Sequence, residues 1–187
     1  VMLAREAGVP VTSLPGACAC VTALTMSGLP TGRFAFEAFL PPDKKLRASR
    51  LKELQTETRT IILYEAPHRL VKTLAELQEA LGERRISVCR ELTKKHETVF
   101  AATIGEALAY YEENEPKGEC VLVIEGIAAK ELEKAAQAEW QQISIEEHMQ
   151  QYLERGMEKK EAMKAVAADR GIGKREVYQA LLNSADE

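Results

Sequence analysis

The chain has 187 residues, a formal net charge of −4 and a hydrophobic content of 45%. This length suits one medium-sized domain, or one domain with a small appendage, and the composition supports a real core. The negative net charge argues against a surface that is basic throughout and binds nucleic acid, although it permits a local basic patch. No stretch approaches the roughly 18 uninterrupted apolar residues of a membrane span, and no secretory signal opens the chain, so we expect no membrane contact.

The first residues are typical of the end of a helix. Residues 1–8 suit a last helical turn with Gly8 as its C-terminal cap, and residues 9–14 are predicted to form a short strand. No initiator methionine comes first. We therefore expect the chain to begin inside a βα unit and to be a fragment of a longer protein.

Short apolar runs and longer amphipathic segments then alternate. The runs expected to be extended are residues 34–40, 60–64, 86–89, 97–102 and 120–124. The segments expected to be helical are residues 17–26, 45–56, 67–81 and 104–113. Strands that alternate with helices of about 10–15 residues predict an α/β domain with a substantially parallel or mixed sheet. We place this domain at residues 1–127.

The four cysteines, Cys18, Cys20, Cys89 and Cys120, include no C-x-x-C pair. This spacing predicts neither a zinc site nor a disulfide framework, and it favours a reducing, cytoplasmic location.

The composition changes after residue 127. Residues 128–143 are rich in Ala, Glu, Gln and Lys and suit a helical linker. Residues 144–187 contain three short amphipathic segments separated by glycine turns, and Ser144 with Glu147 forms a capping box. This pattern predicts a small helix-turn-helix-like domain, either a nucleic-acid contact or an ordinary packing module.

The stretch LYEAPHRL, residues 63–70, places His68 and Arg69 where a buried strand passes into a helix. Pro67 suits the first helical position, because its missing N–H would have no partner there. A cation in that first turn opposes the helix dipole by about 0.3–1 kcal/mol, so a partner is implied. The partner is either Glu65 or an anionic ligand.

Two further basic stretches stand out. Residues 90–96 carry Arg90, Lys94, Lys95 and His96 after another strand end, where phosphate contact and ordinary surface charge are both open. The stretch with Lys44, Lys45, Arg47 and Arg50 is explained by the solvated face of a helix.

Four blocks of the sequence together resemble a known family. They read LPGACACVTALTMSGLPTGRFAFEAFLPPDKKLR, IILYEAPHRL, RELTKKHETVFAATIGEAL and KGECVLVIEG. In this order and at this spacing they resemble the ribosomal RNA small subunit methyltransferase I family, which has the tetrapyrrole methylase fold. The resemblance covers residues 1–126, and the tail resembles the small helix-turn-helix extension of family members.

The resemblance implies an S-adenosylmethionine-dependent methyltransferase, in homodimeric form, that modifies a ribose 2′-hydroxyl of a cytidine in small-subunit ribosomal RNA. It implies two α/β domains with the cofactor in the cleft between them. The N-terminal domain is expected to be missing here, so the chain alone is expected to bind the cofactor weakly and to be inactive. Two alternatives stay open: a methylase of a corrin or porphyrin precursor, and a non-enzymatic nucleic-acid-binding module.

The resemblance also implies roles for individual residues. A P-G-x-[ST]-A element for the cofactor falls on Pro15, Gly16, Ala17, Cys18 and Ala19, with Cys18 in place of the usual hydroxyl residue. Further implied cofactor contacts are Glu65, Leu92 and Glu119. The implied catalytic residues are Glu65, His68 and Arg69, and no metal is expected. The implied RNA contacts are Arg69, Arg90, Lys94, Lys95, Lys174 and Arg175.

Overall fold

The computed structural model describes residues 1–183, apart from the side chain of Glu139. The chain forms two compact units, Val1–Gly126 and Ile127–Glu187. The first unit is built on a five-stranded sheet with the strand order β1-β2-β5-β3-β4. Its strands are β1 (Phe34–Phe39), β2 (Thr60–Glu65), β3 (Arg85–Arg90), β4 (Thr98–Thr103) and β5 (Cys120–Ile124).

The sheet is mixed. β1 pairs with β2 in parallel, whereas β5 is antiparallel to both β2 and β3, and β4 is antiparallel to β3. It follows that β1, β2 and β3 all run in the same direction. The predicted α/β fold with a mixed sheet is therefore confirmed.

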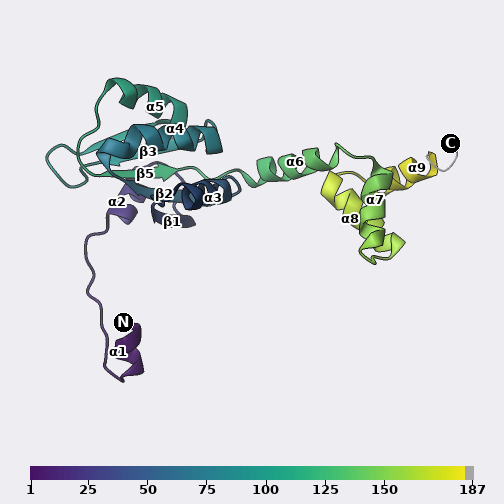
Figure 1. Cartoon of the computed structure of the whole chain (residues 1–187), viewed down its shortest axis with the longest axis horizontal. Coiled ribbons are helices and arrows are strands. Elements are labelled where there is room, and N and C mark those ends of the chain that lie inside the picture. Colours follow the sequence, from purple (N-terminus) through teal and green to yellow (C-terminus); the bar gives the residue numbers. More distant parts are fainter. Residues whose placement is uncertain (184–187) are drawn as a thin grey trace. The chain divides into compact units, whose positions relative to one another are not determined.

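Helices cover both faces of this sheet (Figure 1). α4 (Leu70–Leu81) and α5 (Ile104–Glu113) bury leucine and isoleucine side chains against one face, and α3 (Lys44–Leu54) packs against α4. α2 (Ala19–Met26) packs on the other face in a smaller cluster with Ile62, Val121 and Val123. Because alternate residues of a strand point to opposite faces, Ile61 and Leu63 join the larger core while Ile62 joins the smaller one.

Local sequence signals set the helix ends. Asp43 caps α3 by accepting hydrogen bonds from the backbone N–H groups of Lys45 and Leu46. Thr103 and Glu106 form a reciprocal capping box at the start of α5. These side chains satisfy backbone donors that have no partner within the helix.

Two predicted elements differ in the structure. α1 (Met2–Glu6) is present and Gly8 follows it with a φ of +71°, but residues 9–14 form no strand. Pro10 lacks a donor for a strand ladder, and Val9, Val11 and Leu14 are exposed rather than buried against a sheet.

The segment after β2 begins with a 3-10 turn, Pro67–Arg69, and α4 starts only at Leu70. Arg69 is therefore the N-cap residue of α4 rather than part of its first turn. Ala66 is extended because the residue before a proline avoids the helical region, and a tight 3-10 turn then leads into the helix.

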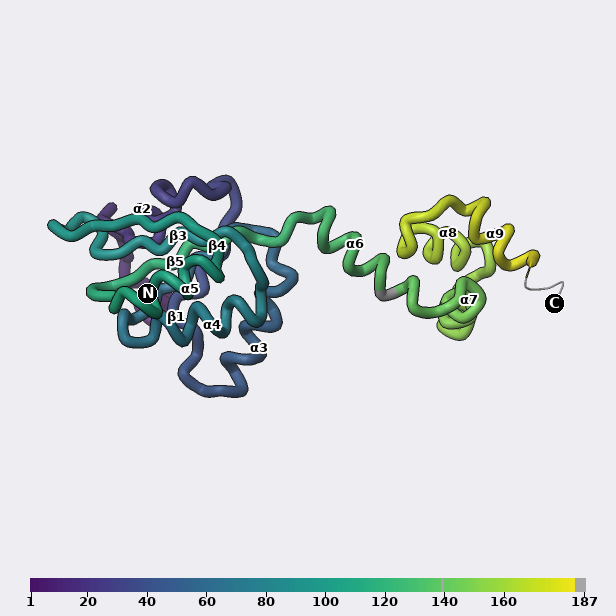
Figure 2. The backbone as a smooth tube through the Cα atoms, turned by 90° about the horizontal axis from the view of Figure 1, so that it is seen from above, coloured from purple at the N-terminus to yellow at the C-terminus, as the bar shows by residue number. Residues whose placement is uncertain are grey.

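The second unit is helical, as predicted for the tail (Figure 2). It consists of α6 (Ala129–Trp140), α7 (Ile145–Glu154), α8 (Lys159–Arg170) and α9 (Lys174–Asn183). Met149, Val166 and Val177 lie in its core. The capping box of Ser144 and Glu147 starts α7, and Gly171 ends α8 in the left-handed conformation. None of the helices within residues 1–183 combines the length and apolar character that crossing a membrane requires.

A buried histidine links three helices of the second unit. His148 is fully buried and stacks on Trp140, with ring centroids 3.8 Å apart. Arg170 Nε donates to His148 Nδ1 at 3.2 Å, and Asp169 Oδ2 lies 3.3 Å from Nε2. Burial, and then the charge of Arg170, lower the pKa of His148 despite the opposing effect of Asp169. The folded unit therefore holds this side chain neutral.

The second unit should lose stability in mildly acidic solution. Unfolded His148 takes up a proton below about pH 6.5, whereas the folded side chain resists protonation until a lower pH. The stability contributed by the neutral side chain is therefore present above about pH 6.5 and is lost below it, with a slope of at most about 1.4 kcal/mol per pH unit. Urea unfolding measured by the fluorescence of Trp140, the single tryptophan, reports this unit.

Two variants serve as controls for this prediction. The His148→Gln variant should lose the pH dependence between pH 7 and 5, because glutamine cannot titrate. The His96→Gln variant, changed at an exposed position in the first unit, should keep it. Parallel pH profiles for wild type and His148→Gln would contradict the assignment.

Candidate active site

The candidate catalytic residues gather at one edge of the sheet. Since β2 and β3 run in the same direction, their carboxyl ends lie at the same edge, together with the amino end of β5. Glu65 lies opposite Cys120, and Cys120 lies opposite Arg90. Glu65 and Arg90 are thus two strand spacings apart, about 10 Å. The LYEAPHRL stretch and the basic loop after β3 therefore flank a common edge.

Glu65 is the buried charge at this edge. Its side chain is only 2% exposed. Thr73 Oγ1 donates to Glu65 Oε2 at 2.6 Å, and the backbone N–H of Ala66 donates to Oε1 at 2.8 Å. A carboxylate can remain ionised away from water only when such donors and nearby cations compensate for its lost hydration.

Arg47 is one of these cations, and its position differs from the prediction. We expected a solvated helix face, but the residue is 6% exposed. Its guanidinium donates to Thr73 Oγ1 at 2.8 Å and to Glu76 Oε2 at 2.5 Å, and one nitrogen lies 3.9 Å from Glu65 Oε2. Helix periodicity cannot identify this role, because Glu65, Thr73 and Glu76 come from other elements.

Arg69 and His68 lie at the surface of the same site. Arg69 Nε is 3.7 Å from Glu65 Oε1, and the Arg69 side chain is 35% exposed. This separation exceeds a normal hydrogen bond, so the guanidinium keeps N–H groups for another ligand. His68 is exposed beside it. Glu65 is therefore a charged neighbour of Arg69, and the pair is a loose one.

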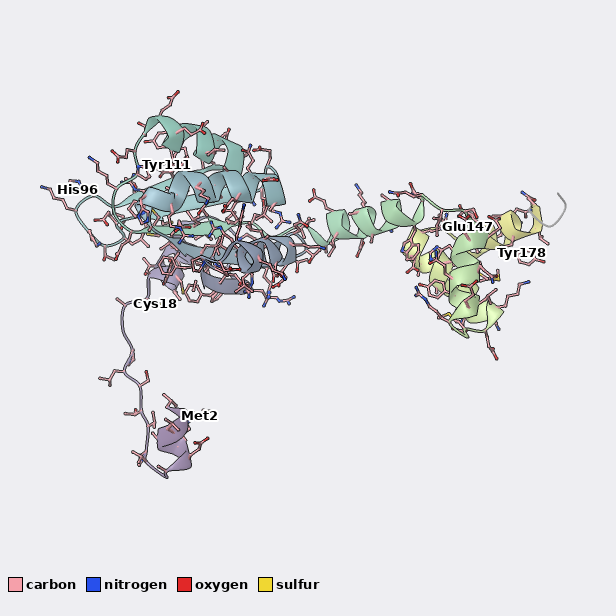
Figure 3. All side chains as sticks on the ribbon, in the orientation of Figure 1. Met2, Cys18, His96, Tyr111, Glu147 and Tyr178 are labelled. Atoms are coloured by element: carbon pink, nitrogen blue, oxygen red, sulfur yellow. The ribbon has the colours of Figure 1, made fainter. Side chains whose placement is uncertain are left out.

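The basic loop after β3 contains both paired and exposed cations. Arg90 Nε donates to the carbonyl of Lys117 at 3.0 Å, and Lys94 Nζ lies 3.1 Å from carboxylate oxygens of both Glu91 and Glu119. Lys95 and His96 are exposed. They line an open pocket of about 620 Å³ (Figure 3 labels His96). Lys95 thus brings positive charge to the pocket, whereas Lys94 is neutralised.

Backbone strain marks the same loop. Glu91 and Thr93 have φ values of +50° and +64°, which side-chain-bearing residues rarely adopt. Gly118 has a φ of +78°, and a Cβ there would collide with the Glu91 side chain. Glu91 also accepts a hydrogen bond from the Glu119 backbone N–H at 3.1 Å. Strain of this kind collects near functional sites, and it adds Glu91 and Gly118 to the residues expected from the sequence.

The turn before α2 presents small, exposed residues. Pro15, Gly16, Cys18 and Ala19 are all exposed, and Cys18 is the N-cap residue of α2 in an extended conformation. The first intrahelical bond runs from Thr22 N–H to the Cys18 carbonyl, so the earlier N–H groups have no acceptor within the helix. Such donors suit an anionic group on a ligand.

The structure brings some of the predicted cofactor residues together. Leu92 packs against the cluster that contains Cys20 of α2. Glu119 stands just before β5 with an 87% exposed side chain.

The remaining predicted RNA contacts, Lys174 and Arg175, lie in the second unit, at the exposed start of α9. Within residues 1–183, no group of three or more His, Cys, Asp or Glu side chains is arranged to hold a metal ion.

Comparison with known proteins identifies the family. A family model described as Tetrapyrrole (Corrin/Porphyrin) Methylases matches residues 1–108, more than half of the chain. The chain belongs to the tetrapyrrole methylase family. A solved structure of the methyltransferase CobJ has the same fold, with a TM-score of 0.51 and 19% identity over 66% of this chain and 54% of that one.

Curated relatives of higher identity carry a more specific name, "Ribosomal RNA small subunit methyltransferase I". The protein from Halalkalibacterium halodurans is 43% identical over 95% of this chain and 61% of its own length. The protein from Bacillus subtilis is 44% identical over 91% of this chain and 58% of its own length. The chain thus spans about three fifths of the length of these relatives.

Removing the Thr73 hydroxyl should destabilise the first unit. The Thr73→Val variant leaves Glu65 and Arg47 each without one buried hydrogen bond, and we expect a loss of about 1–3 kcal/mol. Thr73→Ser keeps the hydroxyl and should cost less. Native-state hydrogen exchange of the β2 amides measures the effect in this unit. Equal protection in the two variants would show that the hydroxyl contributes nothing.

Proposed function

We propose that the protein transfers a methyl group from S-adenosylmethionine to the ribose 2′-hydroxyl of a cytidine in small-subunit ribosomal RNA. The name carried by relatives that are 43–44% identical supports the RNA substrate. The family supports the methyl transfer. Because the chain spans 58–61% of the length of these relatives, we propose that the 187 residues alone bind the cofactor weakly and are inactive.

One observation carries this proposal: the cations of LYEAPHRL and of the loop after β3 share an edge of the sheet in an otherwise acidic protein. A nucleic-acid phosphate backbone is bound mainly by such local positive charge. A corrin or porphyrin precursor is also anionic, through its carboxylates, so positive charge at this edge suits both substrate classes. The name carried by relatives that are 43–44% identical is what favours RNA.

The residues around the α2 turn fit the cofactor. S-adenosylmethionine supplies a methyl group on a positively charged sulfur and carries a carboxylate. The exposed turn from Pro15 to Ala19 offers backbone N–H groups for that carboxylate, and small residues there permit close approach. Leu92 and Glu119 stand on neighbouring loops for the remainder of the cofactor.

We propose that His68 and Arg69 act on the substrate at this edge of the sheet. Arg69 holds a phosphate next to the ribose, because its partly exposed guanidinium can donate several hydrogen bonds in a fixed geometry. His68 accepts the proton of the 2′-hydroxyl, since it is exposed beside Arg69 and histidine is the side chain that most often serves as a general base. Arg90 and Lys95 extend the phosphate contact along the edge, whereas the expected contact of Lys94 is opposed by its pairing with Glu91 and Glu119.

Glu65 acts in this mechanism by positioning. Its carboxylate is buried and already accepts hydrogen bonds from Thr73 and Ala66, so it is poorly placed to accept a proton from substrate. It instead attracts Arg69 and fixes the turn that carries His68. In-line methyl transfer depends strongly on orientation, so a rigid turn contributes to the rate.

The helical tail has a supporting role in the proposal. Lys174 and Arg175 begin α9 at exposed positions and are proposed to contact ribosomal RNA away from the reacting nucleotide. A homodimer and a cytoplasmic location complete the proposal. Light scattering on the purified protein tests the dimer.

The experiment uses protein produced from its complete gene, S-adenosylmethionine with a labelled methyl group, and small ribosomal subunits from a strain that lacks the corresponding enzyme. We expect label in small-subunit RNA, recovered as 2′-O-methylcytidine. Label in a corrin or porphyrin precursor instead would contradict the RNA assignment. RNA binding without any methyl transfer would reduce the protein to a binding module.

Replacing Arg69 tests the site in the same assay. Arg69→Ala should slow single-turnover methylation by at least about tenfold, which is 1.4 kcal/mol of transition-state stabilisation, with little change in cofactor affinity. Arg59→Ala is the matched control, because Arg59 pairs with Glu57 at the opposite end of β2 and should have no effect on rate. A lowered melting temperature with normal turnover in Arg69→Ala would leave Arg69 a purely structural role.

A further inference from the structure

Two cysteines meet at the start of α2. Cys18 Sγ lies 3.5 Å from Cys20 Sγ. Cys18 is exposed, whereas Cys20 is 8% exposed and packs in the smaller core cluster beside Ile62. An outside reagent therefore reaches Cys18 first, with the second thiol directly behind it.

The backbone permits a bond between these sulfurs. Residues two positions apart cannot have Cα atoms separated by more than about 7 Å, which is close to the range that disulfides span. Cys18 is the extended N-cap residue, and residues 9–17 before it carry no helix or strand. Moving its sulfur from 3.5 Å to a bond length of about 2.05 Å thus disturbs little beyond the first turn of α2.

We propose that Cys18 and Cys20 form a reversible dithiol–disulfide site, with low-molecular-weight disulfides such as oxidised glutathione as the oxidant. The Cys18 thiolate attacks one sulfur of the oxidant, which gives a mixed disulfide and releases one thiol. The Cys20 thiol then loses its proton to water, and the resulting thiolate attacks Cys18 Sγ and displaces the second thiolate, which takes up a proton from water. Two protein thiols are oxidised and one disulfide of the oxidant is reduced to two thiols.

The surroundings of the two thiols indicate why Cys18 attacks the oxidant and Cys20 then attacks Cys18. The backbone N–H of Val21, and then the Cys20 thiol, lower the pKa of Cys18, so its thiolate forms readily. Burial, and then its neighbour Cys18, raise the pKa of Cys20, which suits a protonated thiol that donates to Cys18. Burial raises the pKa of Cys89 and of Cys120 to about 11, so these two are unreactive.

The resulting disulfide should be easily reduced. It closes a very short loop, so it restrains the unfolded chain little and gains little stability from doing so. It also forces a tight ring onto a helix start, and strained, exposed disulfides have the more oxidising potentials typical of labile bonds. The sulfur chemistry depends only on this local geometry, so the proposal stands or falls independently of methyl transfer.

The test treats the folded chain with oxidised glutathione near neutral pH, alkylates the remaining thiols and maps tryptic peptides by mass. Cleavage after Arg5 and Arg33 leaves Cys18 and Cys20 in one peptide, whereas Cys89 and Cys120 fall in two others. We expect the first peptide to lose two hydrogen atoms and to carry no glutathione. The other two should be fully alkylated only after unfolding, and dithiothreitol should reverse the change.

Two variants make the outcome decisive. Cys20→Ser should stop at a stable glutathione adduct on Cys18, because the resolving thiol is gone. Cys18→Ser, which places a favourable N-cap residue at this position, should slow oxidation at position 20 by at least about tenfold. A persistent glutathione adduct on wild-type Cys18, or reaction of Cys89 at a comparable rate, would overturn the proposal. Circular dichroism confirms that each variant is folded.

Discussion

A buried carboxylate at the end of β2 is the constraint on which the candidate site depends. Glu65 needs compensation for its lost hydration, and it obtains this from Thr73, the Ala66 backbone and the nearby Arg47 guanidinium. These partners come from α4, from the turn after β2 and from α3. Satisfying one charge therefore ties three elements to one strand end, and the turn with His68 is fixed as a consequence.

The rest of the edge is arranged around this fixed point. Strand register sets Arg90 two strands from Glu65, and the Glu91 side chain joins the loop after β3 to the segment before β5. Leu122 and Ile124 are fully buried in the larger core behind this edge. The sheet thus sets the separation between the turn with Arg69 and the loop after β3, the two segments that we propose contact phosphate.

Sequence patterns predicted the elements well, because continuous apolar runs such as β5 and capping boxes such as Ser144–Glu147 are local signals. The prediction was wrong for residues 9–14, where an apolar alternation has no neighbouring strand with which to pair among the described residues. The burial of Arg47 was also missed. Its partner Glu76 lies 29 residues away, so only the packing of α3 on α4 shows that this cation is internal.

We propose that Glu65 sets the position from which Arg69 acts. A double-mutant cycle on single-turnover methylation, normalised to folded protein, measures the coupling between the two residues. If Glu65 positions Arg69, Glu65→Gln slows methylation, and Arg69→Ala causes a much smaller loss in the Glu65→Gln background than in wild type. An identical loss from Arg69→Ala in both backgrounds would show that the two residues act independently.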